Sequence, residues 1–200
     1  MPYPPEPWDL RGQLHLSLWR PPLSTLPALP SGVRPVLLGG RPLVGTAWVD
    51  YEPGGVLSYR ELLCAVAVRQ GARPRVSITD IWVDSPESRD GGRALWGIPK
   101  DLAEFEFGAT LRARLAGALI AESTVVPRRR LPGRWPAAFS TAQALAGRLA
   151  VTPVRSTSAV ELTRVDTTFA PDGPLGHLAG LRPVISLSLR DFRLRFGPRR

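Results

Sequence analysis

The chain has 200 residues, of which 44% are hydrophobic and 22% charged, and its net charge at pH 7 is +9. This length predicts one domain over residues 1–200 with a sizeable core, and no apolar run approaches the ~18–20 residues of a membrane span. The N-terminus lacks the pattern of a signal peptide, and the single cysteine, Cys64, excludes a disulfide within the chain. We therefore expect a cytoplasmic protein with no membrane partner.

Alternating apolar residues predict strands along most of the chain. In residues 13–19, Leu14, Leu16 and Leu18 fall on one face, as in a strand with one buried side. Alternation or a long β-prone run recurs in residues 56–68, 75–83, 103–108, 110–123, 158–169 and 184–197. We expect a mainly β fold with a few helices, arranged as a barrel or sandwich of mostly antiparallel sheet.

Two segments carry helix signals. Ser85-Pro86-Glu87 has the pattern of an N-cap, a first-turn proline and an acid, and Gly91-Gly92 would end this short helix. Residues 139–150 predict a second helix, capped by Ser140 or Thr141. Residues 127–136, which are rich in proline and arginine, predict a loop.

The positive charge raises the question of a nucleic-acid partner. The arginines are dispersed except in residues 127–134 and 195–200, and no zinc-finger, helix-turn-helix or aromatic RNA-binding motif accompanies them. The two histidines, His15 and His177, are isolated from acid and cysteine partners. We therefore expect neither a nucleic-acid partner nor a metal ion, and we predict that Cys64 is a small core residue.

Lys100 is the only lysine in a chain that has 26 Lys and Arg residues. Gly97 and Pro99 constrain the turn before it, and its neighbours in sequence are largely apolar. A lysine in such surroundings loses hydration, which lowers its pKa and favours the neutral amine that attacks a ketone to form a Schiff base. Arginine cannot replace it, because the guanidinium keeps its proton. The alternative is a solvated surface lysine without a catalytic role.

The residues around this lysine resemble the motif of a known family. Residues 92–105, GRALWGIPKDLAEF, resemble the signature of the acetoacetate decarboxylase family, in which Gly-Arg precedes Pro-Lys-Lys. The positions that match are Gly92, Arg93, Gly97, Pro99 and Lys100. Upstream, SYRELLCAV resembles the family's segment with a pocket glutamate, which maps onto Glu61.

The resemblance implies a β-barrel with an interior pocket and a homo-oligomer. It implies that Lys100 forms an imine with a small β-keto or oxo acid, which then loses CO₂. Glu61 would position the substrate or shuttle a proton, and Arg93 would hold a carboxylate or support the loop. Trp96 and Tyr59 would contribute to substrate binding. No cofactor is expected, because the protonated imine is itself the electron sink.

Three positions depart from the family's pattern. Asp101 replaces the second lysine, although an extended backbone would point its side chain away from that of Lys100. The second pocket glutamate has no counterpart at residues 46–48, and Asp50 is the nearest acid. The candidates for the family's N-terminal pocket arginine are Arg11 and Arg20.

These departures leave two alternatives open. The first keeps the imine but gives aldol or dehydration chemistry on a keto acid. The second is a barrel that binds a small ligand without catalysis.

Overall fold

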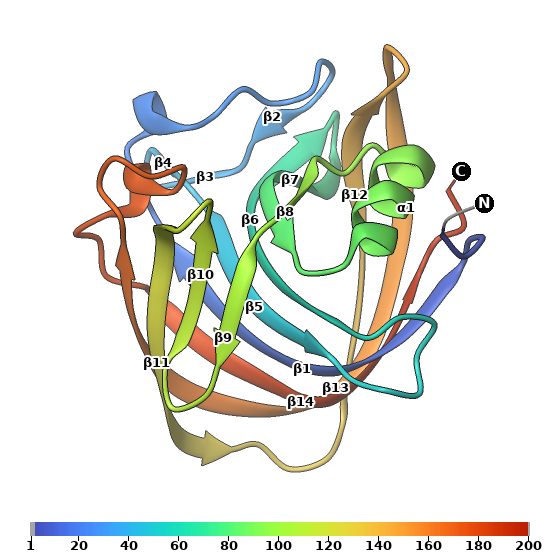
Figure 1. The fold of residues 1–200 in the computed structure, drawn as a ribbon. Helices are drawn as coiled ribbons and strands as arrows, with labels where there is room; N and C mark the ends of the chain where they lie inside the picture. Colours follow the sequence, from blue (N-terminus) through green and yellow to red (C-terminus); the bar gives the residue numbers. More distant parts are fainter. Residues whose placement is uncertain (1–2, 200) are drawn as a thin grey trace.

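The computed structural model describes residues 3–199, and strands dominate it (Figure 1). The strands are β1 (Trp8–Trp19), β2 (Arg34–Pro35), β3 (Leu37–Leu38), β4 (Arg41–Pro42), β5 (Val44–Tyr51), β6 (Tyr59–Gln70), β7 (Arg73–Val83), β8 (Lys100–Leu102), β9 (Glu104–Phe107), β10 (Leu111–Leu115), β11 (Ala118–Arg130), β12 (Trp135–Leu145), β13 (Arg148–Phe169) and β14 (Ile185–Phe196). The helices are α1 (Pro86–Trp96) and the short 3₁₀ helices η1 (Leu23–Thr25) and η2 (Gly176–Leu178). The prediction of a mainly β fold is confirmed.

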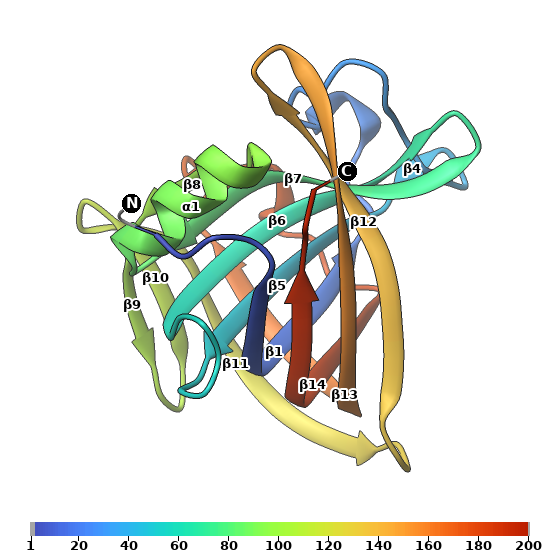
Figure 2. The same ribbon diagram turned by 90° about the vertical axis from the view of Figure 1, so that its right-hand side faces the viewer.

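One large sheet, mostly antiparallel, organises the fold. Its strand order is β12-β7-β6-β5-β1-β14-β13-β11-β10-β9, with β2 on β6 and β8 on β7. Because β12 also pairs with β13, part of the sheet returns on itself and forms a ring of strands (Figure 2). The sheet continues beyond the ring through β11, β10 and β9, so the fold differs from a strict barrel.

The ring closes between β12 and β7 through one main-chain pair and through the side chain of Gln143. Between β12 and β7 the only ladder pair among residues 3–199 is the parallel one between Thr141 and Val76. Next to it, the buried Gln143 amide donates to the Ile78 carbonyl at 2.9 Å and accepts from the Ile78 N–H at 2.9 Å. The side chain thereby satisfies main-chain groups that would otherwise be buried without partners.

Strand β6 is buried on both faces. Leu62 and Cys64 pack into one cluster with Trp48, while Tyr59 and Glu61 point to the opposite face. Burial on both sides explains why this segment is a nearly continuous apolar run instead of a clean alternation. The prediction that Cys64 is a core residue is confirmed, since its exposed fraction is 0%.

Helix α1 begins as predicted but is longer. The Ser85 side chain accepts from the Ser88 N–H at 3.1 Å, and the helix ends at Gly97 with φ +68°. Gly91 and Gly92 lie inside it, so the prediction that they end the helix was wrong. A Cβ at Gly91 would lie 2.5 Å from the Trp8 ring, which shows that this glycine serves close packing and not termination.

The predicted second helix is a β-hairpin. Residues 139–150 form the end of β12 and the start of β13, joined by Ala146 and Gly147 with φ +49° and +74°. Positive φ at both turn residues is typical of the tight type I′ hairpin turn. The helix prediction was wrong because the pairing of β12 with β13, and the closure of the ring against β7, outweigh the helix propensity of the alanines.

The arginine-rich loop is shorter than predicted. Strand β11 continues to Arg130, where it pairs with Glu161 of β13, so only residues 131–134 connect it to β12. Its arginine side chains are nevertheless exposed.

In the described residues, 3–199, no helix has the length and apolar character needed to cross a membrane.

Candidate active site

Lys100 lies where helix α1 turns back onto the sheet. After Gly97 the chain runs through Pro99 into β8, in which Lys100 pairs in parallel with Ile81 of β7. The lysine is 3% exposed, whereas the Asp101 side chain points to the opposite, solvent-exposed side. The alternative of a solvated lysine is therefore wrong, and the predicted separation of Lys100 from Asp101 is confirmed.

The amine of Lys100 uses all three of its donor positions. Nζ donates to Glu61 Oε2 at 2.8 Å, to Ser88 Oγ at 2.8 Å and to the Tyr59 hydroxyl at 3.1 Å. It also lies 4.8 Å from the centre of the Tyr59 ring, a cation–π distance. Three acceptors around one amine match the three N–H groups of an ammonium ion.

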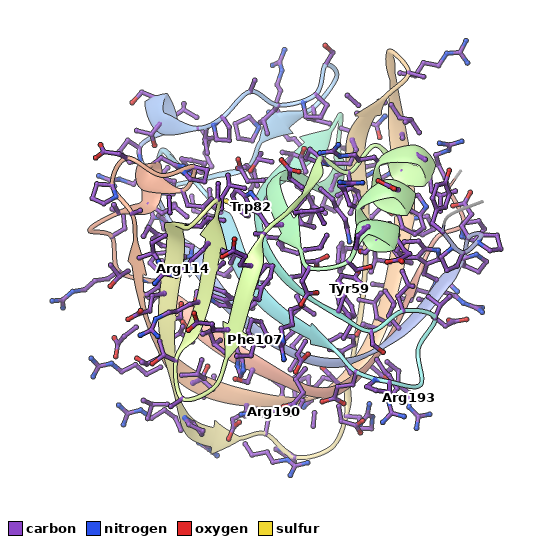
Figure 3. The ribbon with its side chains drawn as sticks, in the orientation of Figure 1. Tyr59, Trp82, Phe107, Arg114, Arg190 and Arg193 are labelled. Atoms are coloured by element: carbon purple, nitrogen blue, oxygen red, sulfur yellow. The ribbon has the colours of Figure 1, made fainter. Side chains whose placement is uncertain are left out.

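Glu61 is the centre of this buried network. Its exposed fraction is 2%, and its second oxygen, Oε1, accepts from the Tyr51 hydroxyl at 3.3 Å. Tyr51 and Tyr59 are direct cross-strand partners on β5 and β6, with ring centres 4.4 Å apart. Figure 3 shows Tyr59 close to α1, from which Ser88 reaches the lysine.

Burial and charge act in opposite directions on the amine. Burial lowers the pKa of Lys100, but the neighbouring Glu61 and Tyr59 raise it, and the net result is a pKa above the ordinary value. The prediction of a lowered pKa was wrong, because the sequence does not show that a carboxylate lies 2.8 Å from the amine. Burial raises the pKa of both Tyr51 and Tyr59, so both hydroxyls keep their protons at neutral pH.

The glycine of the Gly-Arg motif makes room for the lysine. A Cβ at Gly92 would lie 2.8 Å from Lys100 Cδ and 3.0 Å from Cε, so the aliphatic part of the lysine lies directly on the helix backbone. We expect Gly92→Ala to displace the amine from Glu61 and to lower oxo-acid adduct formation at Lys100 by about tenfold or more, as expected when a reacting group moves by about 1 Å. Mass spectrometry of the reduced adduct measures this.

Gly108→Ala is the matched control, because nothing lies within 4 Å of the added methyl group and its φ is not positive. Alanine inside a helix normally stabilises it by about 0.5–1 kcal/mol relative to glycine, so a lower melting temperature for Gly92→Ala would confirm the steric clash. Equal adduct yields in the two variants would contradict the packing role of Gly92.

Arg93 and Trp96 lie next to the site without reaching the amine. Arg93 Nε donates to the main-chain carbonyl of Lys100, and its guanidinium lies 3.6 Å from Asp101, half exposed to solvent. This geometry is the loop support that was one of its two predicted roles. Trp96 is buried and donates to Glu6 Oε2 at 2.7 Å, with its ring against Trp8 in the core.

The other candidates from sequence lie elsewhere. Thr46 and Trp48 belong to the opposite face of the sheet, where they hydrogen-bond to Trp19 and Ser123. Among residues 3–199, none of Arg11, Arg20 and Asp50 hydrogen-bonds to the Lys100 network, so no second carboxylate joins Glu61 at the amine.

Sequence reasoning missed Tyr51 and Ser88. The hairpin register that pairs Tyr51 with Tyr59 could have located the first. Helical spacing could have located the second, because Ser88, Gly91 and Gly92 follow one another at the i, i+3, i+4 interval of one helix face.

The histidines are separate from this network. His15 Nδ1 lies 2.7 Å from Ser188 Oγ, and burial lowers the pKa of His15 to about 4. Within residues 3–199, no three His, Cys, Asp or Glu side chains gather as a metal site requires.

Comparisons with known proteins bear on the family and the fold. The sequence model of the family described as acetoacetate decarboxylase matches residues 24–170. The chain is similar to the structure of acetoacetate decarboxylase from Legionella pneumophila subsp. pneumophila str. Philadelphia 1, with a TM-score of 0.78 and 17% identity over 100% of this chain and 88% of that one. It is similar to the enduracididine biosynthesis enzyme MppR complexed with pyruvate, with a TM-score of 0.71 and 18% identity over 98% and 90% of the two chains.

A third similar structure is that of an acetoacetate decarboxylase-like enzyme from Sphingomonas wittichii RW1, with a TM-score of 0.69 and 14% identity over 99% and 93% of the two chains. No curated protein sequence matches the chain. At these identities the structures show a shared fold.

Proposed function

Since the chain belongs to the acetoacetate decarboxylase family, we propose that it is a lyase in which Lys100 forms a Schiff base with a small β-keto acid and releases CO₂. The observation that supports this most is the buried contact of 2.8 Å between Lys100 Nζ and Glu61 Oε2. Buried charges are rare unless they are paired, and titratable groups perturbed by burial and a specific partner are typical of active sites.

The first step needs a neutral amine. Glu61 or water takes the proton that the raised pKa holds on Lys100, and the amine then attacks the ketone carbon. The carbonyl oxygen leaves as water, and a C=N bond replaces the C=O bond. The protonated imine carries its positive charge where the ammonium was, but it has only one N–H to donate. The Glu61 carboxylate stabilises it by charge and accepts that hydrogen bond.

The second step breaks a carbon–carbon bond. The electron pair of the bond to the carboxylate moves into the iminium group, CO₂ leaves, and a neutral enamine remains. Glu61 or the protonated Tyr59 hydroxyl then supplies the proton that the enamine carbon takes up. Water adds to the resulting imine and releases the ketone together with the free lysine.

Substrate must displace neighbours to reach the amine, because Lys100 is only 3% exposed. A dry site strengthens the interaction between the iminium and the Glu61 carboxylate, and it limits premature hydrolysis of the intermediate.

A second candidate keeps the imine and changes the outcome. Within the described residues, Glu61 is the only acid at the amine, and Arg93 is turned towards solvent. A site for decarboxylation would therefore lack the second acid and the arginine that the family's pattern implies. The same imine with pyruvate loses a methyl proton to give an enamine, which adds to an aldehyde. The similar structures include MppR with the condensation product of pyruvate and imidazole 4-carboxaldehyde.

One experiment distinguishes the candidates. The protein is incubated with acetoacetate or pyruvate, reduced with borohydride and digested, and the mass of the peptide containing residue 100 is measured alongside CO₂ release. Labelling with CO₂ release from acetoacetate supports the decarboxylase. Labelling without CO₂ supports aldol or dehydration chemistry, and no labelling supports a non-catalytic barrel that binds a small ligand.

A further inference from the structure

A groove of about 790 Å³ lies over the outer side of β1, β14 and β13. The loop after β5 borders it at Gly54, and the start of β12 borders it at Pro136, Ala137 and Ala138. Figure 2 shows β1, β14, β13 and β12 side by side, and Figure 3 shows Arg193 at this end of the molecule. We call it the arginine groove, after Arg11, Arg155, Arg193 and Arg195, which line it.

The strand register places these four arginines on one face. Arg11 is the cross-strand partner of Arg193, and Arg155 is the partner of Arg195. Neighbouring strands are about 4.8 Å apart, so the guanidinium groups share a small area. Like charges directly opposite each other destabilise a sheet, which makes two Arg–Arg pairs side by side costly in an unliganded protein.

One carboxylate compensates only one of the four charges. Asp9 accepts from Arg195 Nε at 2.9 Å and from Nη2 at 2.8 Å, and this hydrogen bonding lowers the pKa of Asp9. The side chains of Arg11, Arg155 and Arg193 make no hydrogen bond or ion pair with any residue between 3 and 199. Three guanidinium groups therefore face the groove uncompensated.

The groove and the lysine site lie on opposite faces of the sheet. Leu10 and Leu194, which alternate with the arginines on β1 and β14, pack into the core clusters that also contain Tyr59 and Tyr51. Since successive strand residues point to opposite faces, the arginines point away from Lys100. A ligand in the groove would therefore lie across the sheet from Lys100.

We propose that the arginine groove binds a small ligand that carries two or more closely spaced phosphate groups. The planar guanidinium fork pairs bidentately with phosphate oxygens. The three uncompensated guanidinium groups, Arg11 opposite Arg193 and Arg155 on the next strand, suit two adjacent phosphates. The volume is in the range of small-molecule sites, about 300–1,000 Å³. Pro136 and Ala138 offer an apolar border for the rest of the ligand, and Thr157, opposite Arg193, offers a hydroxyl.

Calorimetric titration with inorganic tripolyphosphate at 0.15 M salt tests the proposal. Arg155→Gln/Arg193→Gln removes two groove charges, while Arg73→Gln/Arg148→Gln removes two exposed arginines outside it and is the charge-matched control. We expect saturable 1:1 binding by the wild-type protein and the control. The groove variant should bind at least about tenfold more weakly, because its charge-assisted hydrogen bonds are lost.

Three results would overturn this assignment. They are no saturable binding by the wild-type protein, equal weakening in both double variants, and preferential binding of a single-stranded oligonucleotide that tripolyphosphate cannot displace. The last would identify the groove as a nucleic-acid surface instead of a small-molecule site. Thermal melting of each variant establishes that the fold is intact.

Discussion

Lys100→Arg should reduce borohydride-dependent labelling by an oxo acid to the level of the N-terminal amine, and should lower turnover by at least about a thousandfold. The substitution keeps a positive charge next to Glu61, but a guanidinium does not lose its proton and cannot form the imine. Because the chain has no other lysine, the N-terminal amine is the only competing primary amine. Intact-mass and peptide-mass measurements on the reduced adducts give the result.

Arginine is larger than lysine, and the side chain it replaces is almost fully buried. Lys100→Met therefore accompanies it as a variant of similar length that also lacks an amine, and circular dichroism and thermal melting report whether each variant folds. A wild-type protein that is labelled only at its N-terminus, with both variants folded, would refute the Schiff-base mechanism. The ligand-binding barrel would then be the better explanation.

Glu61→Gln should move imine formation to lower pH while it lowers turnover. In the wild-type protein, burial lowers the pKa of Lys100, and Glu61 together with Tyr59 outweighs that effect. Removing the Glu61 carboxylate shifts the balance towards burial, so the pKa falls. A larger fraction of the amine is then neutral at a given pH, and trapping begins at a lower pH. Turnover should fall by about 10²–10⁴-fold, because the amide cannot shuttle the proton.

The measurement is the rate of borohydride trapping between pH 6 and 10, together with turnover at each pH. Glu104→Gln is the matched control, because this exposed acid on β9 lies outside the lysine network and should leave the pH profile unchanged. A trapping profile that stays in place, or moves to higher pH, would show that Glu61 does not control the charge of the amine.

The buried ion pair between Lys100 and Glu61 also predicts how stability depends on pH. Because the folded-state pKa of Lys100 is raised, the stabilisation that comes from its charge is fully present below the unfolded value of about 10.4 and is lost as pH rises through the folded value. The free energy of unfolding of Glu61→Gln should not show this decrease at alkaline pH. Denaturant unfolding of both proteins at alkaline pH measures the difference.

The sequence determined the features that depend on neighbouring residues. Alternation predicted the strands from 13–19 to 184–197, and the Ser85-Pro86-Glu87 cap predicted the start of α1. The single lysine after Gly97 and Pro99 predicted which residue to consider as the nucleophile. These features could be predicted from the sequence because caps, turns and side-chain periodicity act within a few residues.

Only the tertiary structure decided the features that depend on remote partners. Residues 139–150 form a hairpin that closes the ring against β7 at Thr141 and Gln143, which their own helix propensity does not reveal. The charge of Lys100 depends on Glu61, 39 residues earlier in the chain, and on Tyr59. Strand β6 brings both of these side chains to the amine, and α1 brings Ser88. A pKa responds to the burial and charges around an atom in space, and those are fixed only when the strands and α1 pack together.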